Sequence, residues 1–204
     1  FLKTKAHGEL DAQDSWYSFA TKGEGDDIIV AYDYHICWKG WANGDRGHTT
    51  ERHNSYYMVF NTKTNTWTNI EEEELNLPIT REVANEKTLV AEAEGSLWTF
   101  NGSTHLDRKG NPHIGISVGT DLGNLTGGPK QTRHYRWTGE EWVGGDPVNL
   151  EAFGENVDTR GDFFIDQKTG HITFALVNQE SGEGVAAYYT STNHGKKFTK
   201  KELL

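Results

Sequence analysis

A repeated pattern of strands and turns runs along the chain, and it limits the possible folds more than any other feature. Each unit reads as a strand, a turn of the type Asp-x-x-Gly, a strand with aliphatic alternation, a strand ending in Tyr or Trp, and an outer strand carrying Trp or Phe. The units are expected at about 16–82, 86–147 and 148–204, and the second is expected to open with a strand at 88–93. Four-stranded units of about 50 residues are typical of β-propeller blades. We therefore predict an all-β chain of antiparallel propeller blades, without a second domain.

Three such units are too few for a closed propeller, which typically has about four to eight blades. The chain also begins at Phe1 without an initiator Met, which favours a processed or truncated protein. We therefore expect the remaining blades to come from a missing N-terminal part. With 23 glycines and 12% aromatic residues, the composition favours turn-rich β structure, and we find no convincing amphipathic helix.

The composition also narrows the class of partner. A formal net charge of -10 argues against a nucleic-acid partner, because phosphate binding needs clustered Lys and Arg. An anionic polysaccharide is still compatible, because a few arginines and histidines can line an otherwise acidic cleft. No apolar run approaches the roughly 20 residues needed to cross a bilayer, so no membrane association is expected. The single cysteine, Cys37, excludes an intrachain disulfide and is either a small buried hydrophobe or a thiolate ligand.

Strands are expected at 30–38 and 55–61, and a polar cluster follows from the alternation of the first, which contains Cys37. Asp33, His35 and Cys37 share one face of this strand, because successive side chains point to opposite faces. Two further histidines return on the following loop and strand, so that one thiolate and three imidazoles are available. Zinc takes such N and S ligands in structural sites. We predict a zinc ion held by His35, Cys37, His48 and His53, the alternative being a buried cysteine among ordinary histidines.

Longer stretches of the chain resemble a known family. These stretches are HNSYYMVFNTKTNTWTNIEEEELNLPIT, THLDRKGNPHIGI, TRHYRWTGEEW and FFIDQKTGHITFALV, and the resemblance covers about 28–177. They resemble the BNR-4 type propeller repeats of secreted polysaccharide lyases, and within these the chain is most similar to ulvan lyases and related uronate-cleaving enzymes. The resemblance implies a seven-bladed propeller, a secreted or periplasmic enzyme that cleaves an anionic polysaccharide by β-elimination, and a structural zinc ion.

The resemblance also implies catalytic roles. In the family a His or Tyr abstracts the C5 proton of the uronate, and an Arg or similar group neutralises its carboxylate. Tyr34 followed by Arg52 roughly fits this order, and we predict them as the catalytic pair, with Tyr32 and Arg46 binding substrate. A guanidinium matches a carboxylate, and a base must lie within about 3 Å of its proton. The alternatives are packed tyrosines and an arginine that is solvated or paired with Glu51. The family's catalytic histidine has no match here and is expected in the missing part.

Other residues are predicted to hold the sugar chain. Trp38 and Trp41 offer flat apolar rings that can stack on pyranose faces, although core packing is the usual fate of Trp. Arg133 and Arg136 lie close together in the second unit and could extend an anionic subsite. Two histidines of that unit could each replace one zinc ligand from a neighbouring blade: His105 and His134.

Two other functions are compatible with the sequence. One is a non-catalytic propeller that binds carbohydrate. The other is a sialidase-like glycoside hydrolase, which would need an arginine triad that these residues do not assemble. A lyase leaves an unsaturated uronate that absorbs ultraviolet light, whereas a hydrolase does not and a binding protein releases no product.

Overall fold

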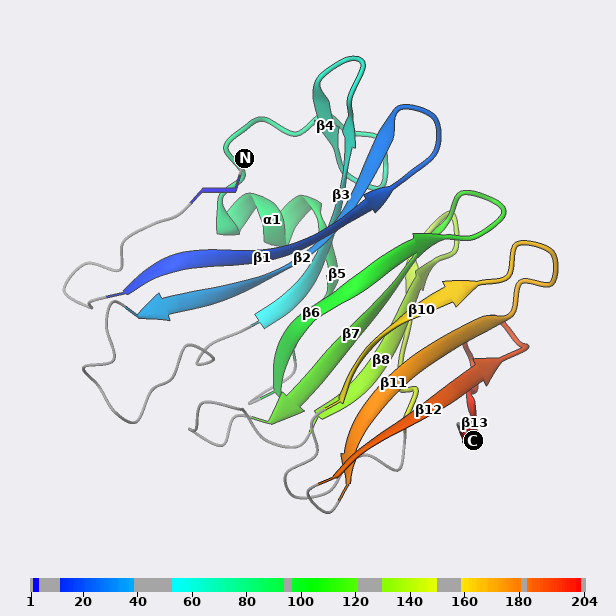
Figure 1. Ribbon diagram of the computed structural model, residues 1–204. Coiled ribbons are helices and arrows are strands. Elements are labelled where there is room, and N and C mark those ends of the chain that lie inside the picture. Colours follow the sequence, from blue (N-terminus) through cyan, green and yellow to red (C-terminus); the bar gives the residue numbers. More distant parts are fainter. Residues whose placement is uncertain are drawn as a thin grey trace.

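The computed structural model describes residues 2–3, 12–38, 53–93, 97–120, 130–149, 159–180 and 183–202. Their strands form three antiparallel sheets that follow one another in chain order (Figure 1). The first sheet contains β1 (Ala12–Lys22), β2 (Asp27–Trp38), β3 (His53–Asn61), β4 (Thr66–Thr68) and β5 (Leu89–Ala91). The second contains β6 (Leu97–Leu106), β7 (Pro112–Thr120), β8 (Lys130–Trp137) and β9 (Trp142–Pro147). The third contains β10 (Thr159–Ile165), β11 (Ile172–Glu180), β12 (Glu183–Ser191) and β13 (Thr199–Glu202). The prediction of an all-β chain with antiparallel sheets is confirmed.

A cluster of buried aliphatic side chains packs the first sheet against the second. Ile29 and Ala31 of β2 share one buried cluster with Ile114 and Ile116 of β7. Because alternate residues of a strand point to the same face, this cluster fixes which side of each sheet turns toward the other. Burying such aliphatic side chains contributes about 2 kcal/mol each.

A glycine lets the second and third sheets come close together. Phe163 of β10 and Phe174 of β11 stack with their ring centroids 4.7 Å apart. A Cβ at Gly115 of β7 would lie 2.7 Å from Phe174 Cε1. Any larger residue at this position would push the two sheets apart, so the absence of a side chain at Gly115 is required by the packing.

A helix covers the outer face of the first sheet, which is the face turned away from the second sheet (Figure 1). Helix α1 (Arg81–Lys87) begins after Thr80, whose hydroxyl accepts a hydrogen bond from Val83 N at 3.3 Å. We found no convincing amphipathic helix in the sequence, and the short helix α1 was not predicted. The helix has seven residues and buries only Ala84, so it leaves no helical periodicity to detect in the sequence. Within the described residues, no helix has the length and apolar character needed to cross a membrane.

The outer face of the third sheet is exposed instead. Phe164, Val177 and Tyr188 lie on it and are 57%, 51% and 40% exposed. These are among the most exposed large hydrophobic side chains of the described residues. The stack therefore has one covered outer face and one apolar outer face in contact with solvent.

Strand β5 belongs to the first sheet, not to the second. We expected 88–93 to open the second unit, but Leu89 and Ala91 pair with Tyr56 and Ser55 of β3. The physical reason is the shortness of β4, which pairs only with Val59–Asn61 and leaves the rest of that edge of β3 without partners. Strand β5 returns after α1 and supplies them.

The sheets have two distinct ends. At the turn end, each sheet closes its first two strands with a tight turn, at 23–26, 107–111 and 166–171. In the second of these turns, Asp107 Oδ1 accepts hydrogen bonds from Lys109 N at 2.8 Å and Asn111 N at 2.9 Å. The far end is defined by the strand ends that border 39–52, 121–129, 150–158 and 181–182.

Candidate functional site

Midway along β1 in the first sheet, an exposed tyrosine stacks on a buried histidine. Tyr17 of β1 is 42% exposed, and its ring lies 4.6 Å from the imidazole of His35, with the two planes 14° apart. Asp33, which pairs with Tyr17 in the register, is buried like His35. All three lie on the face that turns toward the second sheet. An aromatic ring held in this way can stack on a sugar, beside a carboxylate and an imidazole.

The predicted zinc ligands are only partly described. His35 lies on the face just named, and the backbone of Cys37 follows two residues later on β2, which ends at Trp38. His53 begins β3 and pairs with Tyr34 in the register. His48 and the side chain of Cys37 lie outside the described residues. Among the residues that are described, no group of three His, Cys, Asp or Glu side chains is placed to hold a metal ion, so the zinc site stays a prediction.

The two alternative ligands lie on another face. His134 packs against Phe163 and Phe174 of the third sheet, and His105 forms a contact with Asp162 of the same sheet at 3.0 Å. Both histidines therefore point from the second sheet toward the third. His35 lies between the first and second sheets, so this structure does not bring His105 or His134 to it.

The predicted tyrosines lie on the opposite face of β2 from His35. Tyr34 has no exposed surface, its hydroxyl donates to Asp14 Oδ1 at 2.7 Å, and the guanidinium carbon of Arg81 lies 4.1 Å from its ring centroid. Tyr32 is 1% exposed, and burial raises the pKa of its hydroxyl, which shares a hydrogen bond with Thr88 Oγ1. In this arrangement both tyrosines are packed under α1. Their burial weighs against direct contact with a substrate, and their catalytic and binding roles stay predictions.

The two predicted anion-binding arginines point to different places. Arg133 pairs with Ile116 and so lies on the face of the second sheet that turns toward the first. Arg136 pairs with His113 and lies on the other face, near the turn end. The structure does not bring them together as one subsite.

The remaining predicted site residues cannot be placed. Four of them fall within 39–52, outside the described residues: Trp41, Arg46, His48 and Arg52. The side chain of Trp38 is not described either. The role of Arg52 in neutralising the uronate carboxylate stays a prediction.

Sequence reasoning missed a buried lysine at the far end. Lys130 begins β8, is 3% exposed, and places its Nζ 4.6 Å from the centroid of the Phe100 ring. A largely desolvated ammonium interacts strongly with any carboxylate that approaches it. Alternation along β8 puts Lys130 on the same face as Thr132 and His134, but only the structure shows that this face is buried.

A buried polar network ties the second and third sheets together at the same end. Asn149 accepts a hydrogen bond from Thr132 N at 2.7 Å and donates one to Asn178 Oδ1 at 2.9 Å. Thr159 also donates to Asn178 Oδ1, at 3.0 Å, and Asn178 donates to Tyr189 Oη at 2.8 Å. The network therefore fixes the positions of Asn149 and Thr159, the residues on either side of 150–158.

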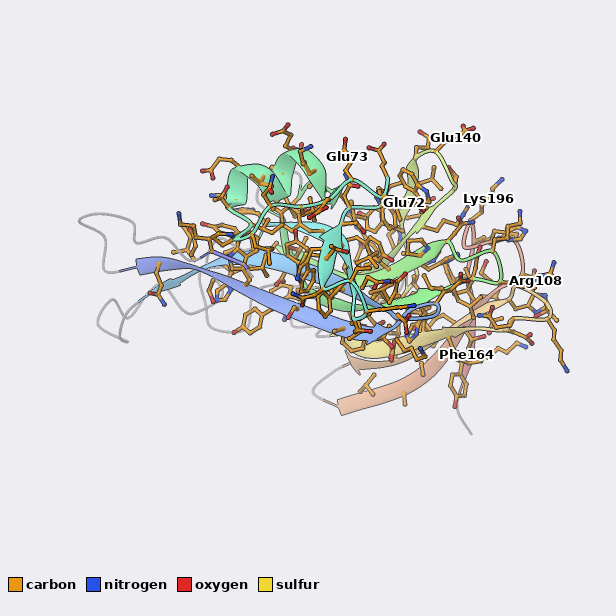
Figure 2. All side chains as sticks on the ribbon, turned by 90° about the horizontal axis from the view of Figure 1, so that it is seen from above. Glu72, Glu73, Arg108, Glu140, Phe164 and Lys196 are labelled. Carbon is orange, nitrogen blue, oxygen red and sulfur yellow. The ribbon has the colours of Figure 1, made fainter. Side chains whose placement is uncertain are left out.

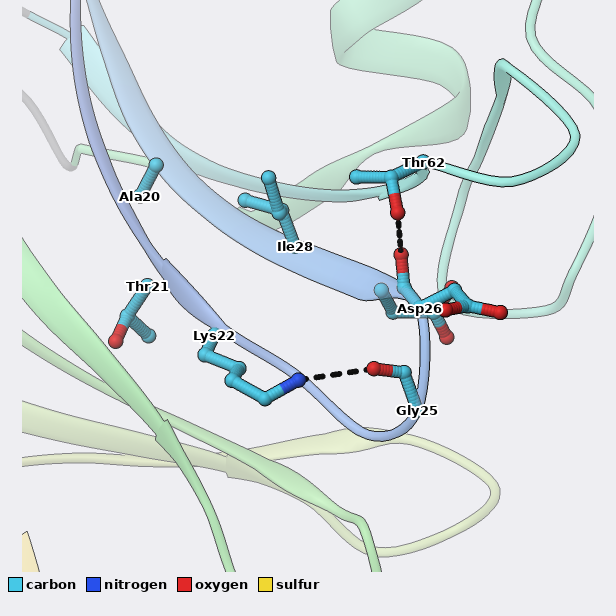
Figure 3. A pocket seen from close by; sticks show the side chains of 8 residues that line it. Ala20, Thr21, Lys22, Gly25, Asp26, Ile28 and Thr62 are labelled. Atoms are coloured by element: carbon cyan, nitrogen blue, oxygen red, sulfur yellow. Dashed lines mark hydrogen bonds between the residues drawn. The ribbon is translucent and has the colours of Figure 1, made fainter.

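Among the described residues, a larger and a smaller hollow lie at the turn end. The larger, about 550 Å³, lies beside the 23–26 turn of the first sheet (Figure 3). Its lysine, Lys22, donates from Nζ to the carbonyl oxygen of Gly25 at 2.9 Å, and Thr62 Oγ1 donates to the carbonyl oxygen of Asp26 at 2.7 Å. The smaller, about 150 Å³, lies between the second and third sheets.

Comparison with known proteins gives the family likeness. No family model matches the chain. Over its full length the chain is 54% identical to a protein of Pseudoalteromonas sp. (strain PLSV) named "Ulvan Lyase-PL25". Over 98% of its length it is 50% identical to an ulvan lyase of Alteromonas sp. (strain LOR), and over its full length 42% identical to one of Nonlabens ulvanivorans. The chain is similar to ulvan lyases. It spans 41%, 40% and 42% of the lengths of these three relatives.

The structures agree with the sequences. All of the chain superimposes on 46% of a solved PL25 ulvan lyase bound to -[GlcA(1-4)Rha3S]-, with a TM-score of 0.86 and 52% sequence identity. A second solved PL25 ulvan lyase gives the same TM-score at 51% identity. The three stacked sheets are thus an arrangement also found within a solved ulvan lyase.

Proposed function

We propose that this chain is part of a polysaccharide lyase that cleaves ulvan, an anionic uronate-containing polysaccharide, by β-elimination. The observation that carries the proposal is the 54% identity to a named ulvan lyase over the full length of the chain. The structural superposition on an ulvan lyase bound to a GlcA-containing saccharide supports the same substrate class.

The chemistry assigns work to specific residues. A base removes the proton at C5 of the uronate, the C4–O4 bond breaks, a C4=C5 double bond forms, and O4 leaves with a proton. The uronate carboxylate opposes this charge build-up, so a cation must neutralise it. We propose Arg52 for that task and Tyr34 as the base. Tyr17 is the competing tyrosine, because it is exposed and lies beside His35, whereas Tyr34 is buried.

The fold and its metal extend the proposal. We propose that the three sheets are blades of a larger propeller with BNR-4 type repeats, in a secreted or periplasmic enzyme. The exposed Phe164, Val177 and Tyr188 support a further sheet packed on the third one. Zinc would be held by the imidazoles and thiolate predicted above, and its loss to a chelator should lower the melting temperature of the purified protein.

The test is the ultraviolet absorbance of unsaturated uronate, followed while the complete protein is incubated with ulvan. Arg52→Ala should lower kcat/KM by roughly 10²-fold to 10³-fold, the effect typical of losing one group that stabilises charge in a transition state. Tyr34→Phe should cost roughly 10²-fold or more if its hydroxyl transfers the proton. Tyr57→Phe is the matched control, because Tyr57 is equally buried but lies in the apolar cluster between the first and second sheets.

The outcomes separate the alternatives. Loss of activity in Tyr17→Phe but not in Tyr34→Phe would keep the lyase and move the base to β1. Reducing ends that appear without absorbance would show a hydrolase of the sialidase-like type. Binding of ulvan without any product would show a non-catalytic propeller, and the proposed activity would be wrong.

A further inference from the structure

The smaller hollow at the turn end differs in charge from the rest of the chain. It lies between the 107–111 turn of the second sheet and the 166–171 turn of the third, with His194 at its rim. Figure 2 shows Arg108 at this end of the molecule. Four of the lining residues are cationic and one, Asp107, is acidic, in a chain of net charge -10. The four cations are Arg108, Lys109, Arg136 and Lys168.

The four cationic side chains of this hollow form no ion pair with the described residues. Asp107 turns its Oδ1 to the backbone of its own turn, at Lys109 N and Asn111 N. Within the described part of the chain, the ion pairs involve Lys87, His105 and His113, and none of the four cations. The larger hollow is different, because its Lys22 is engaged by Gly25. The smaller hollow therefore attracts anions, and its volume of about 150 Å³ suits a small charged group.

A buried imidazole is among the residues that line the hollow. His113 is 3% exposed, and its Nδ1 lies 2.9 Å from His134 Nε2. Burial lowers the pKa of His113 to about 4, although Asp107 opposes this shift, so the ring is neutral near pH 7. Asp107 Oδ2 lies 3.7 Å from His113 Nε2 and favours the tautomer with a proton on that nitrogen. The Nε2–H group of His113 then lies on the side of the hollow where Asp107 is.

We propose that this hollow, at the turn end of the sheets and away from the candidate site, is an anion subsite that binds a sulfate or carboxylate group of the polysaccharide. The assignment to a saccharide rests on the proposed function. Tyr17 lies five residues from the end of β1 at the turn end, roughly 17 Å along the strand, and the hollow lies farther away, between the second and third sheets. A short oligosaccharide cannot reach both sites, whereas a polymer can, so the subsite raises the effective concentration of long substrates at the enzyme.

The test uses the histidine ring signals of the complete protein in NMR spectra, with those of His194 assigned by His194→Gln. Inorganic sulfate and an ulvan oligosaccharide are titrated separately. Lys168→Glu is compared with Lys63→Glu, a matched control, because both lysines are exposed and both donate their backbone N–H to a side-chain oxygen two residues earlier. We expect shifts of the His113 and His194 signals, with a dissociation constant at least about tenfold weaker in Lys168→Glu and unchanged in Lys63→Glu.

Each result decides one point. Saturation by the oligosaccharide at a concentration at least about tenfold lower than sulfate assigns the site to the saccharide. Equal saturation by both makes it a free-anion site and overturns that assignment. Titrations that leave the signals unmoved, or that are the same in Lys168→Glu, overturn the subsite itself.

The absorbance assay on the same variants keeps this inference apart from the lyase proposal. Lys168→Glu should raise KM for polymeric ulvan, leave kcat unchanged, and leave KM for short oligosaccharides unchanged. Elimination with no binding at the hollow would overturn only the subsite. Binding at the hollow with no elimination on any uronate polysaccharide would overturn only the lyase.

Discussion

We expect two buried imidazoles that contact each other to make the free energy of unfolding fall at acid pH. His113 and His134 are both buried, and burial is the main cause that lowers the pKa of each. Arg136 lowers both pKa values further, while His194 lowers and Asp107 raises that of His113. The pair is therefore held neutral between the second and third sheets.

The pH dependence follows from this difference between folded and unfolded states. Unfolded histidines bind protons below about pH 6.5, whereas His113 in the folded protein does so only near pH 4. Its contribution is thus complete above about pH 6.5 and is lost as the pH falls through this window, by on the order of 3 kcal/mol. Urea unfolding at several pH values should show the decline.

A substitution tests the origin of that decline. His113→Gln should flatten the pH dependence between about pH 6.5 and 4, whereas His171→Gln, at a less buried position, should keep it. An unchanged slope in His113→Gln would assign the acid sensitivity to other groups.

Whether a given side chain is buried was the hardest property to predict from the sequence. The alternation of β2 correctly placed Asp33 and His35 on one face, and the same rule puts Tyr34 on the other. Similarly, the spacing of Arg133 and Arg136 already implied opposite faces. What alternation cannot give is which face α1 would cover, because that depends on packing between distant segments.

Strands and turns were predicted better than the elements that cover them. The strands expected at 30–38 and 55–61 are found as β2 and β3, because β-branched and aromatic residues alternate there. Helix α1 was missed because seven residues with one buried alanine leave no pattern. Strand β5 was assigned to the wrong sheet because sequence order says nothing about which edge of β3 lacks partners.

The bulged pairing of β8 with β9 depends on a glycine. Gly144 has φ +122, and a Cβ there would lie 2.3 Å from the carbonyl oxygen of His134. Gly139 has φ +103, but a Cβ added there would meet no atom within 4 Å, so this position separates backbone strain from steric clash. We expect Gly139→Ala to cost about 1 kcal/mol of unfolding free energy and Gly144→Ala about 3 kcal/mol or more. Equal losses in urea unfolding would contradict the clash.

The polar network between the second and third sheets should behave as a unit. Asn149→Ala leaves Thr132 N without its acceptor in a buried place, and we expect a loss of about 2 to 4 kcal/mol. Asn193→Ala, in an exposed turn, should cost less. Adding Asn178→Ala to Asn149→Ala should cost less than the sum of the two single changes, because both act on one network. Additive losses would show that the two amides act independently.

The molecule as a whole is a stack with unlike outer faces. If a further sheet covers the third one in the complete protein, Phe164→Asp should lower the melting temperature by several degrees, because it would bury a charge. Leu77→Asp changes a side chain of similar exposure, 48% against 57%, and should have little effect. Equal, small effects of the two changes would argue that the face stays open to solvent.

The segment from α1 to β5 is attached to the first sheet in a way that affects its motion. Tyr32 and Tyr56 form hydrogen bonds to Thr88 and Asn85 of this segment, and β5 completes an edge that β4 leaves unfinished. Helix α1 and the short edge strand β5 can therefore unfold locally as one unit, while the long pairing of β1 with β2 persists. Hydrogen exchange should then be faster for the backbone amides of this segment and of the strand beneath it than for those of the β1–β2 pairing.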